Sequence, residues 1–179
     1  MKVCIVGNPK VGKTALIKQF LRKSYNPSYL MTMGADFTLK TSIIDGKEYK
    51  IQIWDLSGQD SFREMRTEYY RGASGLFAVF DLANKQTFND IRKWILEFQK
   101  SAQPRLYPLI LIGNKVDLRT KESNIVSPKE GKELVRGLAT EFPSLISKDS
   151  QYMETSAMTG ENVDQAFEVI FRLLVKSED

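Results

Sequence analysis

Eight residues that follow the first apolar run constrain this chain more than any other segment. They match the pattern G-x-x-x-x-G-K-[ST] and are, in order, Gly7, Asn8, Pro9, Lys10, Val11, Gly12, Lys13 and Thr14. The apolar run 3–6 predicts a buried strand before the loop, and the apolar spacing over residues 16–21 predicts a helix after it. Such a loop turns its backbone N–H groups inward and cradles an anion. We therefore expect a nucleotide site in which Lys13 reaches the β- and γ-phosphates and Thr14 offers its hydroxyl to Mg²⁺.

Length and composition predict one globular domain. A chain of 179 residues can bury one core and is too short for two ordinary domains, so we expect residues 1–179 to fold as a unit. The longest apolar runs are far too short to span a bilayer, and the first strand begins at once, so we expect neither a membrane helix nor a signal peptide. The single cysteine, Cys4, cannot form an intramolecular disulfide, which favours the cytoplasm.

The charge pattern and the lack of histidine exclude several classes of function. Without histidine there can be no Ser-His-Asp or Cys-His catalysis and no His-ligated zinc. The net charge of +4 is mild, and basic residues mix with acidic ones along the chain. We therefore expect no nucleic-acid partner.

Strand-like and helix-like patterns alternate along the chain, which predicts an α/β fold. Continuous apolar runs at 3–6, 76–80 and 109–112 are typical of parallel strands buried on both faces. Segments 38–44 and 47–54 flank Asp45-Gly46, a two-residue hairpin signal that adds one antiparallel edge strand. Helices are expected around residues 88–98, over 163–174 and from 127 to about 139, with Ser127 as N-cap and Pro128 at the first position. The prediction is a six-stranded, mostly parallel sheet flanked by five helices.

Three further motifs narrow the choice of nucleotide. Asp55, at the end of the third expected strand, can bind a water on Mg²⁺, and Gly58 can bring its N–H to the γ-phosphate. After the fifth strand, Asp117 in Asn114-Lys115-Val116-Asp117 can accept two hydrogen bonds from N1–H and N2–H₂ of guanine. Adenine lacks this donor pair, so the carboxylate selects against ATP. A backbone N–H in the segment 155–157 can meet guanine O6.

With these motifs in order, the chain resembles a small GTPase of the Ras superfamily over nearly its whole length. Segments 33–37 (MGADF), 51–55 (IQIWD) and 69–73 (YYRGA) are most similar to the Rab branch. The resemblance implies a P-loop NTPase fold and a switch that binds GTP or GDP with Mg²⁺ and hydrolyses GTP slowly. Vesicle and membrane traffic is the process that it suggests.

The resemblance also assigns roles to residues. Switch I covers about 25–37, where Tyr25 stacks on guanine and Thr32 ligates Mg²⁺ and senses the γ-phosphate; switch II covers 55 to about 71. Gln59 orients the attacking water, and Lys13 and Thr32 complete the catalytic set. Thr14, Thr32 and, through water, Asp55 hold the metal. The expected nucleotide-binding positions are Asn8, Pro9, Lys10, Val11, Gly12, Lys13, Thr14, Ala15, Tyr25, Thr32, Gly58, Asn114, Lys115, Asp117, Ser156, Ala157 and Met158.

A partner surface is expected on the hairpin. The period-2 rule places Trp54 on the same face as Lys50 and Gln52. By resemblance, Phe37, Trp54 and Tyr69 form the hydrophobic triad that Rab effectors contact; the alternative is that the chain's own switch residues cover some of them. The partners implied are an exchange factor, a GTPase-activating protein and effectors, and we expect the chain itself to be a monomer.

The sequence departs from the family pattern at several positions. Pro9 replaces a small residue near the γ-phosphate, and it either stiffens the loop or changes the fit for Gln59 or an incoming arginine. Leu56-Ser57 stands where Thr-Ala is usual, which affects hydrolysis more than binding. Met158 replaces a lysine, and its thioether can still cover the base.

Three features of the rest of the chain leave alternatives open. Surplus length at about 141–151 is either a tolerated surface insertion or a partner loop. No cysteine lies near residue 179, so a prenylated tail is either outside this sequence or not used, and peripheral membrane association would need that tail. The arginines at 63, 66 and 71 are interpreted as surface or partner contacts, not as a built-in catalytic finger.

Slow intrinsic hydrolysis controlled by a partner follows from the lack of such a finger. A nucleotide-bound interaction module with little or no hydrolysis is the alternative; Gln59 argues against it, whereas Pro9, Leu56 and Ser57 favour it. A small P-loop kinase would need an acceptor pocket and an arginine-rich lid, and the sequence indicates neither.

Overall fold

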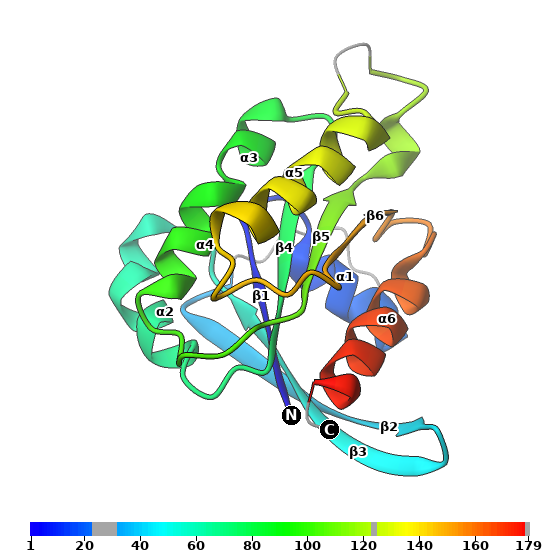
Figure 1. Ribbon diagram of the computed structural model, residues 1–179. Helices are drawn as coiled ribbons and strands as arrows, with labels where there is room; N and C mark the ends of the chain where they lie inside the picture. The colour runs from blue at the N-terminus through cyan, green and yellow to red at the C-terminus, as the bar shows by residue number, and fades with distance from the viewer. Residues whose placement is uncertain (23–31, 123–124, 178–179) are drawn as a thin grey trace.

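A six-stranded sheet lies between two layers of helices (Figure 1). The computed structural model describes residues 1–22, 32–122 and 125–177. The strands run in the order β2-β3-β1-β4-β5-β6, with β2 antiparallel to β3 and the other pairs parallel. Their bounds are β1 Lys2–Val6, β2 Ala35–Ile44, β3 Lys47–Leu56, β4 Gly75–Asp81, β5 Leu109–Asn114 and β6 Gln151–Thr155. The predicted sheet is confirmed.

The helices of the described chain also follow the prediction. They are α1 Lys13–Phe20, α2 Arg63–Tyr69, α3 Lys85–Asn89, α4 Ile91–Gln99, α5 Pro128–Glu141 and α6 Val163–Lys176, with short 3-10 turns at Asp60–Phe62 and Val116–Leu118. Only Asp90, itself near helical geometry, separates α3 from α4, so the helix expected around residues 88–98 is present in two segments. Counting that pair once gives the five expected helices. Among the helices described here, none has the length and apolar character needed to cross a bilayer.

Each face of the sheet carries its own hydrophobic core because alternate strand residues point to opposite sides. In β1, Cys4 packs toward α4 and α5, whereas Ile5 packs toward α1 and α6. In β5, Leu111 packs on the same side of the sheet as Cys4, and Ile112 packs on the same side as Ile5. Burial raises the pKa of the Cys4 thiol to about 12, which makes it an inert core residue.

The hairpin predicted at Asp45-Gly46 is present. Both residues have positive φ, 50° and 80°, as a type I′ turn requires. The two strands pair over their full length, and this register places Phe37 opposite Trp54. The hairpin therefore places two of the three expected effector positions side by side, Phe37 on the edge strand β2 and Trp54 on β3.

The segment after α5 is anchored in the core, so the expectation of a surface insertion is wrong for its apolar residues. Phe142, Leu145 and Ile146 are buried. Tyr107 N–H donates to Leu145 O at 2.8 Å, and Ser147 N–H donates to Tyr107 O at 2.9 Å. The segment therefore behaves as an extra edge element beside the start of β5.

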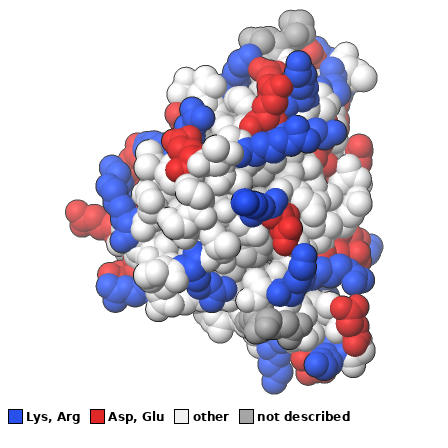
Figure 2. Space-filling model, in the orientation of Figure 1, with Lys and Arg blue, Asp and Glu red and all other residues white. Residues whose placement is uncertain are grey.

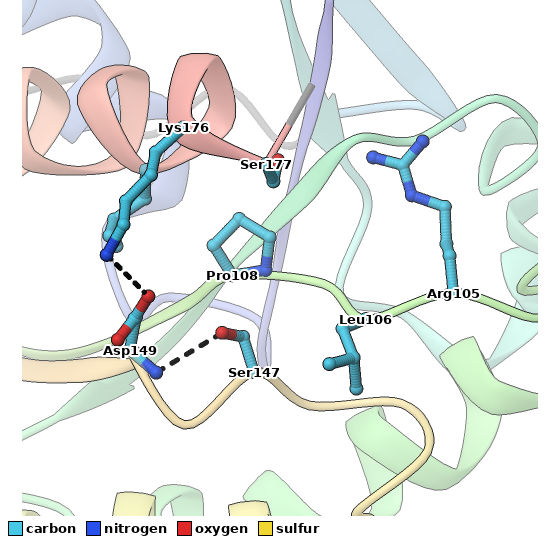
Figure 3. Close-up of a pocket in the computed structure, with 8 residues that line it drawn as sticks. Arg105, Leu106, Pro108, Ser147, Asp149, Lys176 and Ser177 are labelled. Atoms are coloured by element: carbon cyan, nitrogen blue, oxygen red, sulfur yellow. Dashed lines mark hydrogen bonds and ion pairs between the residues drawn. The ribbon is translucent and has the colours of Figure 1, made fainter. Parts of the chain in front are cut away.

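Surface charges of both signs are interspersed, and the described cavity lies away from the P-loop. Figure 2 shows basic and acidic side chains interspersed on one face, as the sequence predicted. A cavity of about 500 Å³ opens where β5 begins and α6 ends (Figure 3). It is lined by Arg105, Leu106, Pro108, Ser147, Asp149, Leu173, Lys176 and Ser177. Because the P-loop follows the carboxyl end of β1, this cavity is at the opposite edge of the parallel sheet.

Candidate functional site

The P-loop leaves β1 through backbone conformations that bend it into a cradle. Lys10 and Gly12 have positive φ, 65° and 101°, and a mixture of left- and right-handed residues turns successive N–H groups inward. A Cβ on Gly12 would lie 2.2 Å from Asn114 Nδ2, so only glycine fits there. α1 then begins at Lys13 without an acidic residue in its first turn, which keeps its N-terminus suited to an anion.

Lys13 lies folded back over the loop. Its side chain is nearly buried, and Nζ donates to Gly7 O at 2.7 Å and to Asn8 O at 3.0 Å. Burial lowers the pKa of Lys13 to about 8, the charge of Asp55 opposes that shift and the charge of Arg66 adds to it. A phosphate group beside this ammonium would stabilise its charged form, so the site favours an anionic ligand.

Three oxygen-bearing side chains from separate elements meet next to Lys13. Thr14 Oγ1 on α1 donates to Asp55 Oδ2 at the end of β3, at 2.5 Å. Thr32 Oγ1 lies 2.9 Å from Thr14 Oγ1 and donates to Asp55 Oδ2 at 3.2 Å. These are the three residues predicted to hold Mg²⁺, and the fold brings them together.

The donor set fits a hard cation. Asp55 is 4% exposed, and its Oδ1 has no hydrogen-bond partner among the described residues. Burial raises the pKa of this carboxyl, although bonds from Thr14 and Thr32 and the charge of Lys13 oppose that shift. Mg²⁺ prefers oxygen ligands from one or two carboxylates together with water and phosphate. In the described part of the chain no group of three His, Cys, Asp or Glu side chains could hold a metal, so the protein oxygens available here are those of Asp55 and the two threonine hydroxyls.

Asn114 joins the P-loop to the two loops expected at guanine. Its Nδ2 donates to Val11 O at 2.8 Å, and its Oδ1 accepts from Thr155 Oγ1 and from Ala157 N–H, both at 3.1 Å. Asn114 is 1% exposed, so these contacts are shielded from water. Its role in this structure is to hold the carboxyl ends of β5 and β6 against the phosphate loop.

Asp117 is held by a residue of the loop that follows β6. Ser156 Oγ donates to Asp117 Oδ1 at 2.5 Å, which holds one oxygen of this carboxylate. Lys115, in the left-handed region at φ 71°, pairs with Asp81 through a 2.6 Å Nζ–Oδ2 contact. Met158 is 56% exposed beside this loop. The structure thus assembles the predicted base-binding positions at one edge of the sheet.

Gly58 lies directly against the P-loop backbone, and Gln59 follows it. A Cβ on Gly58 would lie 2.5 Å from Gly7 O and 2.6 Å from Pro9 N, so a side chain there would collide with the loop backbone. Gln59 Nε2 is buried without a hydrogen-bond partner in the part of the chain that is described. The predicted water-orienting residue is therefore beside the expected phosphate position.

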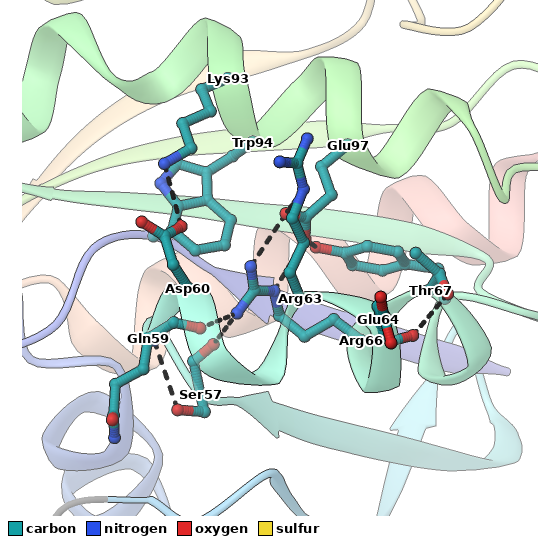
Figure 4. A network of polar contacts seen from close by, with 12 residues as sticks. Ser57, Gln59, Asp60, Arg63, Glu64, Arg66, Thr67, Lys93, Trp94 and Glu97 are labelled. Carbon is teal, nitrogen blue, oxygen red and sulfur yellow. Dashed lines mark hydrogen bonds and ion pairs between the residues drawn. The ribbon is translucent and has the colours of Figure 1, made fainter.

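One residue of the P-loop turns its side chain away from the cradle, and one expectation about switch II is wrong. Asn8 Oδ1 accepts from Trp94 Nε1 at 2.7 Å, and Asn8 Nδ2 donates to Asp90 at 2.6 Å, so this amide faces α4 and leaves the backbone of Asn8 for the expected nucleotide contact. Arg66 was interpreted as a surface contact but is 0% exposed and pairs with Glu97 (Figure 4). The helical spacing could have indicated that Arg66 is buried, because it precedes the buried Tyr70 by four residues and so lies on the same face of the helix.

The hydrophobic triad forms a continuous aromatic surface. Phe37 stacks on Trp54 with ring centroids 5.0 Å apart, and Tyr69 lies 5.4 Å from Trp54. Phe37 is 55% exposed, while Trp54 donates through Nε1 to Gln52 at 3.1 Å. The predicted shared face of Trp54 and Gln52 is confirmed. Tyr25, the residue expected to stack on guanine, lies outside the described residues.

Comparisons with known proteins agree with this geometry. The Ras family profile matches residues 2–176. The GTP-binding protein ypt2 of Schizosaccharomyces pombe is 36% identical over 99% of this chain and 82% of its own length. The Ras-related protein SEC4 of Saccharomyces cerevisiae is 35% identical over 100% of this chain and 77% of its own length. The Ras-related protein Rab-8A of Gallus gallus is 36% identical over 96% of this chain and 76% of its own length. With its P-loop, base-binding loops and relatives all in accord, the chain belongs to the Ras family and is a Rab-like small GTPase.

Proposed function

We propose that this GTPase is a Mg²⁺-dependent switch in which Thr14, Thr32 and Asp55 hold the metal and Gln59 orients the attacking water. The convergence of these two hydroxyls on a buried carboxylate with one unpartnered oxygen is the observation that supports it most. When bound, Mg²⁺ would neutralise charge on the β- and γ-phosphates. Lys13, beside these residues, would add a further positive charge toward the phosphates.

Base recognition is assigned to the loops after β5 and β6. Asp117 would accept from guanine N1–H and N2–H₂, and Ser156 holds its carboxylate for that contact. Asn114 keeps both loops in register with the P-loop. Loss of the γ-phosphate on hydrolysis would free Thr32 and Gly58, which belong to the two expected switches.

The cellular role that we propose is control of vesicle and membrane traffic through effectors. The relatives are Rab-like, and the aromatic surface of Phe37, Trp54 and Tyr69 suits partner binding because aromatic anchors are enriched at interfaces. An exchange factor and a GTPase-activating protein would set the timing. An arginine supplied by such a partner typically raises hydrolysis by about 10³–10⁵, so intrinsic turnover is expected to be slow.

Single-turnover phosphate release from GTP-loaded protein tests these roles. Gln59→Leu should slow release about tenfold or more at unchanged GDP affinity, because its proposed role is confined to the reacting water. Removing Mg²⁺ with a chelator should stop release and speed nucleotide dissociation. Arg172→Ala, at an exposed site near the hairpin turn, is the matched control and should behave as wild type. Unchanged release in Gln59→Leu would contradict the assignment.

A further inference from the structure

A polar network joins switch II, α4 and the P-loop, and its centre is a buried ion pair (Figure 4). The side chains of Arg66 on α2 and Glu97 on α4 are 0% and 2% exposed. Arg66 Nε donates to Glu97 Oε1 at 2.7 Å and Nη2 donates to Oε2 at 2.9 Å. Tyr70 O–H donates to Glu97 Oε1 at 2.8 Å. Bidentate pairing fixes the guanidinium plane as well as its position.

The remaining guanidinium nitrogen reaches the start of switch II. Arg66 Nη1 donates to Ser57 O at 2.9 Å and also to Gln59 O. These carbonyls lie on either side of Gly58, so one planar group holds two peptide orientations around it. Rotation of either peptide would leave a charged donor or a carbonyl unpaired in a buried place, which is unfavourable.

The same helix supports the P-loop. Trp94 Nε1 donates to Asn8 Oδ1 at 2.7 Å, and the Arg66 guanidinium lies 4.7 Å from the centre of the Trp94 ring. Asn8 in turn donates to Asp90, at the start of α4. α4 therefore sets the position of the P-loop and of the Gly58-Gln59 peptide relative to each other.

Close packing makes this relative position important. A Cβ on Gly58 would lie 2.6 Å from the Asn8 carbonyl carbon and from Pro9 N, so the two backbones are already in contact. Gln59 Nε2 is buried and unpartnered within the described residues. The side chain of Gln59 can orient a water accurately when the backbone that carries it is held in place.

We propose that Arg66 is a positioning residue for GTP hydrolysis: anchored by Glu97, it holds the Ser57 and Gln59 carbonyls so that the Gln59 side chain is aligned with the attacking water. Arg66 acts through the backbone of switch II and does not contact the expected nucleotide position. The proposal rests on the role of Gln59 proposed above. It predicts a loss of rate without a loss of nucleotide affinity.

The test replaces the ion pair by apolar side chains of similar length. Removing Arg66 alone would leave Glu97 buried and unpaired, whereas exchange of both partners for apolar residues usually preserves folding. The Arg66→Met/Glu97→Met variant should hydrolyse GTP in single turnover about tenfold or more slowly, since misplacement of a reacting group by about 1 Å can cost about 100-fold. Its GDP and GTP affinities should stay within about twofold of wild type. Arg63→Met is the control, because Arg63 also approaches Glu97, at 3.5 Å, but from a half-exposed position.

A double-mutant cycle with Gln59→Leu separates positioning from general damage. If Arg66 acts through Gln59, the two Met substitutions should have no further effect on the rate in the Gln59→Leu background. A wild-type rate in the Met pair, or an equal loss in both backgrounds, would overturn the proposal. A wild-type rate in Gln59→Leu itself would instead overturn the proposed role of Gln59.

A size-preserving variant keeps the test decisive if the Met pair does not fold. Glu97→Gln retains the shape of the anchor but weakens the bidentate contact. A slower rate at unchanged affinity in this variant supports the proposal, and an unchanged rate contradicts it. Circular dichroism of each variant establishes that it is folded before the rates are compared.

Discussion

Single residues in the P-loop decide how closely switch II can approach the phosphates. Pro9 lacks a backbone N–H and has a fixed φ, and its nitrogen lies where a Cβ on Gly58 would collide. Pro9 is itself exposed, so it is accessible to a partner as well as to switch II. These contacts favour the interpretation that Pro9 tunes the fit of Gln59 or of an incoming arginine.

Pro9→Gly should raise partner-stimulated hydrolysis at least about tenfold while changing nucleotide affinity by less than about threefold. Glycine restores an N–H near the transferring phosphate and removes a ring from the arginine's path, and one added donor to transition-state charge can be worth roughly 10²–10³ in rate. Rates with and without an activating partner, beside GDP affinity, are the measurements. Pro143→Gly, in an exposed turn, is the control. Equal changes in rate and affinity would show that Pro9 merely stiffens the loop.

At the scale of elements, the residues at the start of α5 are sufficient to determine where this helix begins. Ser127 Oγ accepts from Glu130 N–H at 3.3 Å, and Glu130 Oε2 accepts from Ser127 N–H at 2.8 Å, which forms a capping box. Lys85 adds an ion pair to the same carboxylate at 3.0 Å. The Ser127 amide, then Lys85 and the Ser127 hydroxyl, lower the pKa of Glu130 to about 2.

Glu130→Ala should destabilise the protein by roughly 0.3–1 kcal/mol at pH 7, the usual contribution of a carboxylate in the first turn of a helix. A folded-state pKa below the ordinary 4.5 means that the contribution is present above pH 4.5 and is lost as pH falls toward about 2. The difference in unfolding free energy between wild type and variant should therefore shrink between pH 5.5 and pH 3.5, as urea titrations would show. Glu133→Ala, exposed on the same helix, should give a smaller difference. A Glu130→Ala difference that is constant with pH would exclude the charged cap.

Elements with local signals could be predicted, and those fixed by distant contacts could not. Ser127-Pro128 and Asp45-Gly46 carry their own capping or turn chemistry, so the helix start and hairpin were found from sequence. The residues expected at the metal and the base come from spaced motifs and, for Thr32, from the family resemblance, and their roles stay predictions. The spacing to Tyr70 points Arg66 toward the core, but the partner that makes burial of its charge possible, Glu97, is 31 residues away, and no sequence feature joins the two. The bridge between Tyr107 and Ile146 was missed for the same reason.

At the scale of the whole molecule, a bound nucleotide is expected to stabilise the folded state, because buried residues from several strands surround its site. Asn114, Lys13 and Asp55 are almost fully buried around the site, and they tie β1, β3, β5 and β6 to the P-loop. A ligand that binds only the folded state stabilises it in proportion to the logarithm of its concentration. Stability and base specificity should therefore be measurable together.

In Mg²⁺ buffer, each tenfold rise in GDP above its Kd should add about 1.4 kcal/mol to the unfolding free energy, or roughly 3–6 °C in Tm for a chain of this size. ADP should have little effect, because adenine cannot supply the two donors that Asp117 is placed to accept. Asp117→Ala should abolish most of the difference between GDP and ADP, whereas Glu161→Ala, an exposed acid near the β6 loop, should keep it. Adding a chelator should raise the GDP concentration at which this stabilisation begins, and so lower Tm at a given GDP concentration, since Asp55 then remains a buried carboxylate without a cation. A Tm that rises equally with ADP and GDP would place base recognition away from Asp117, and both loops would then need another role.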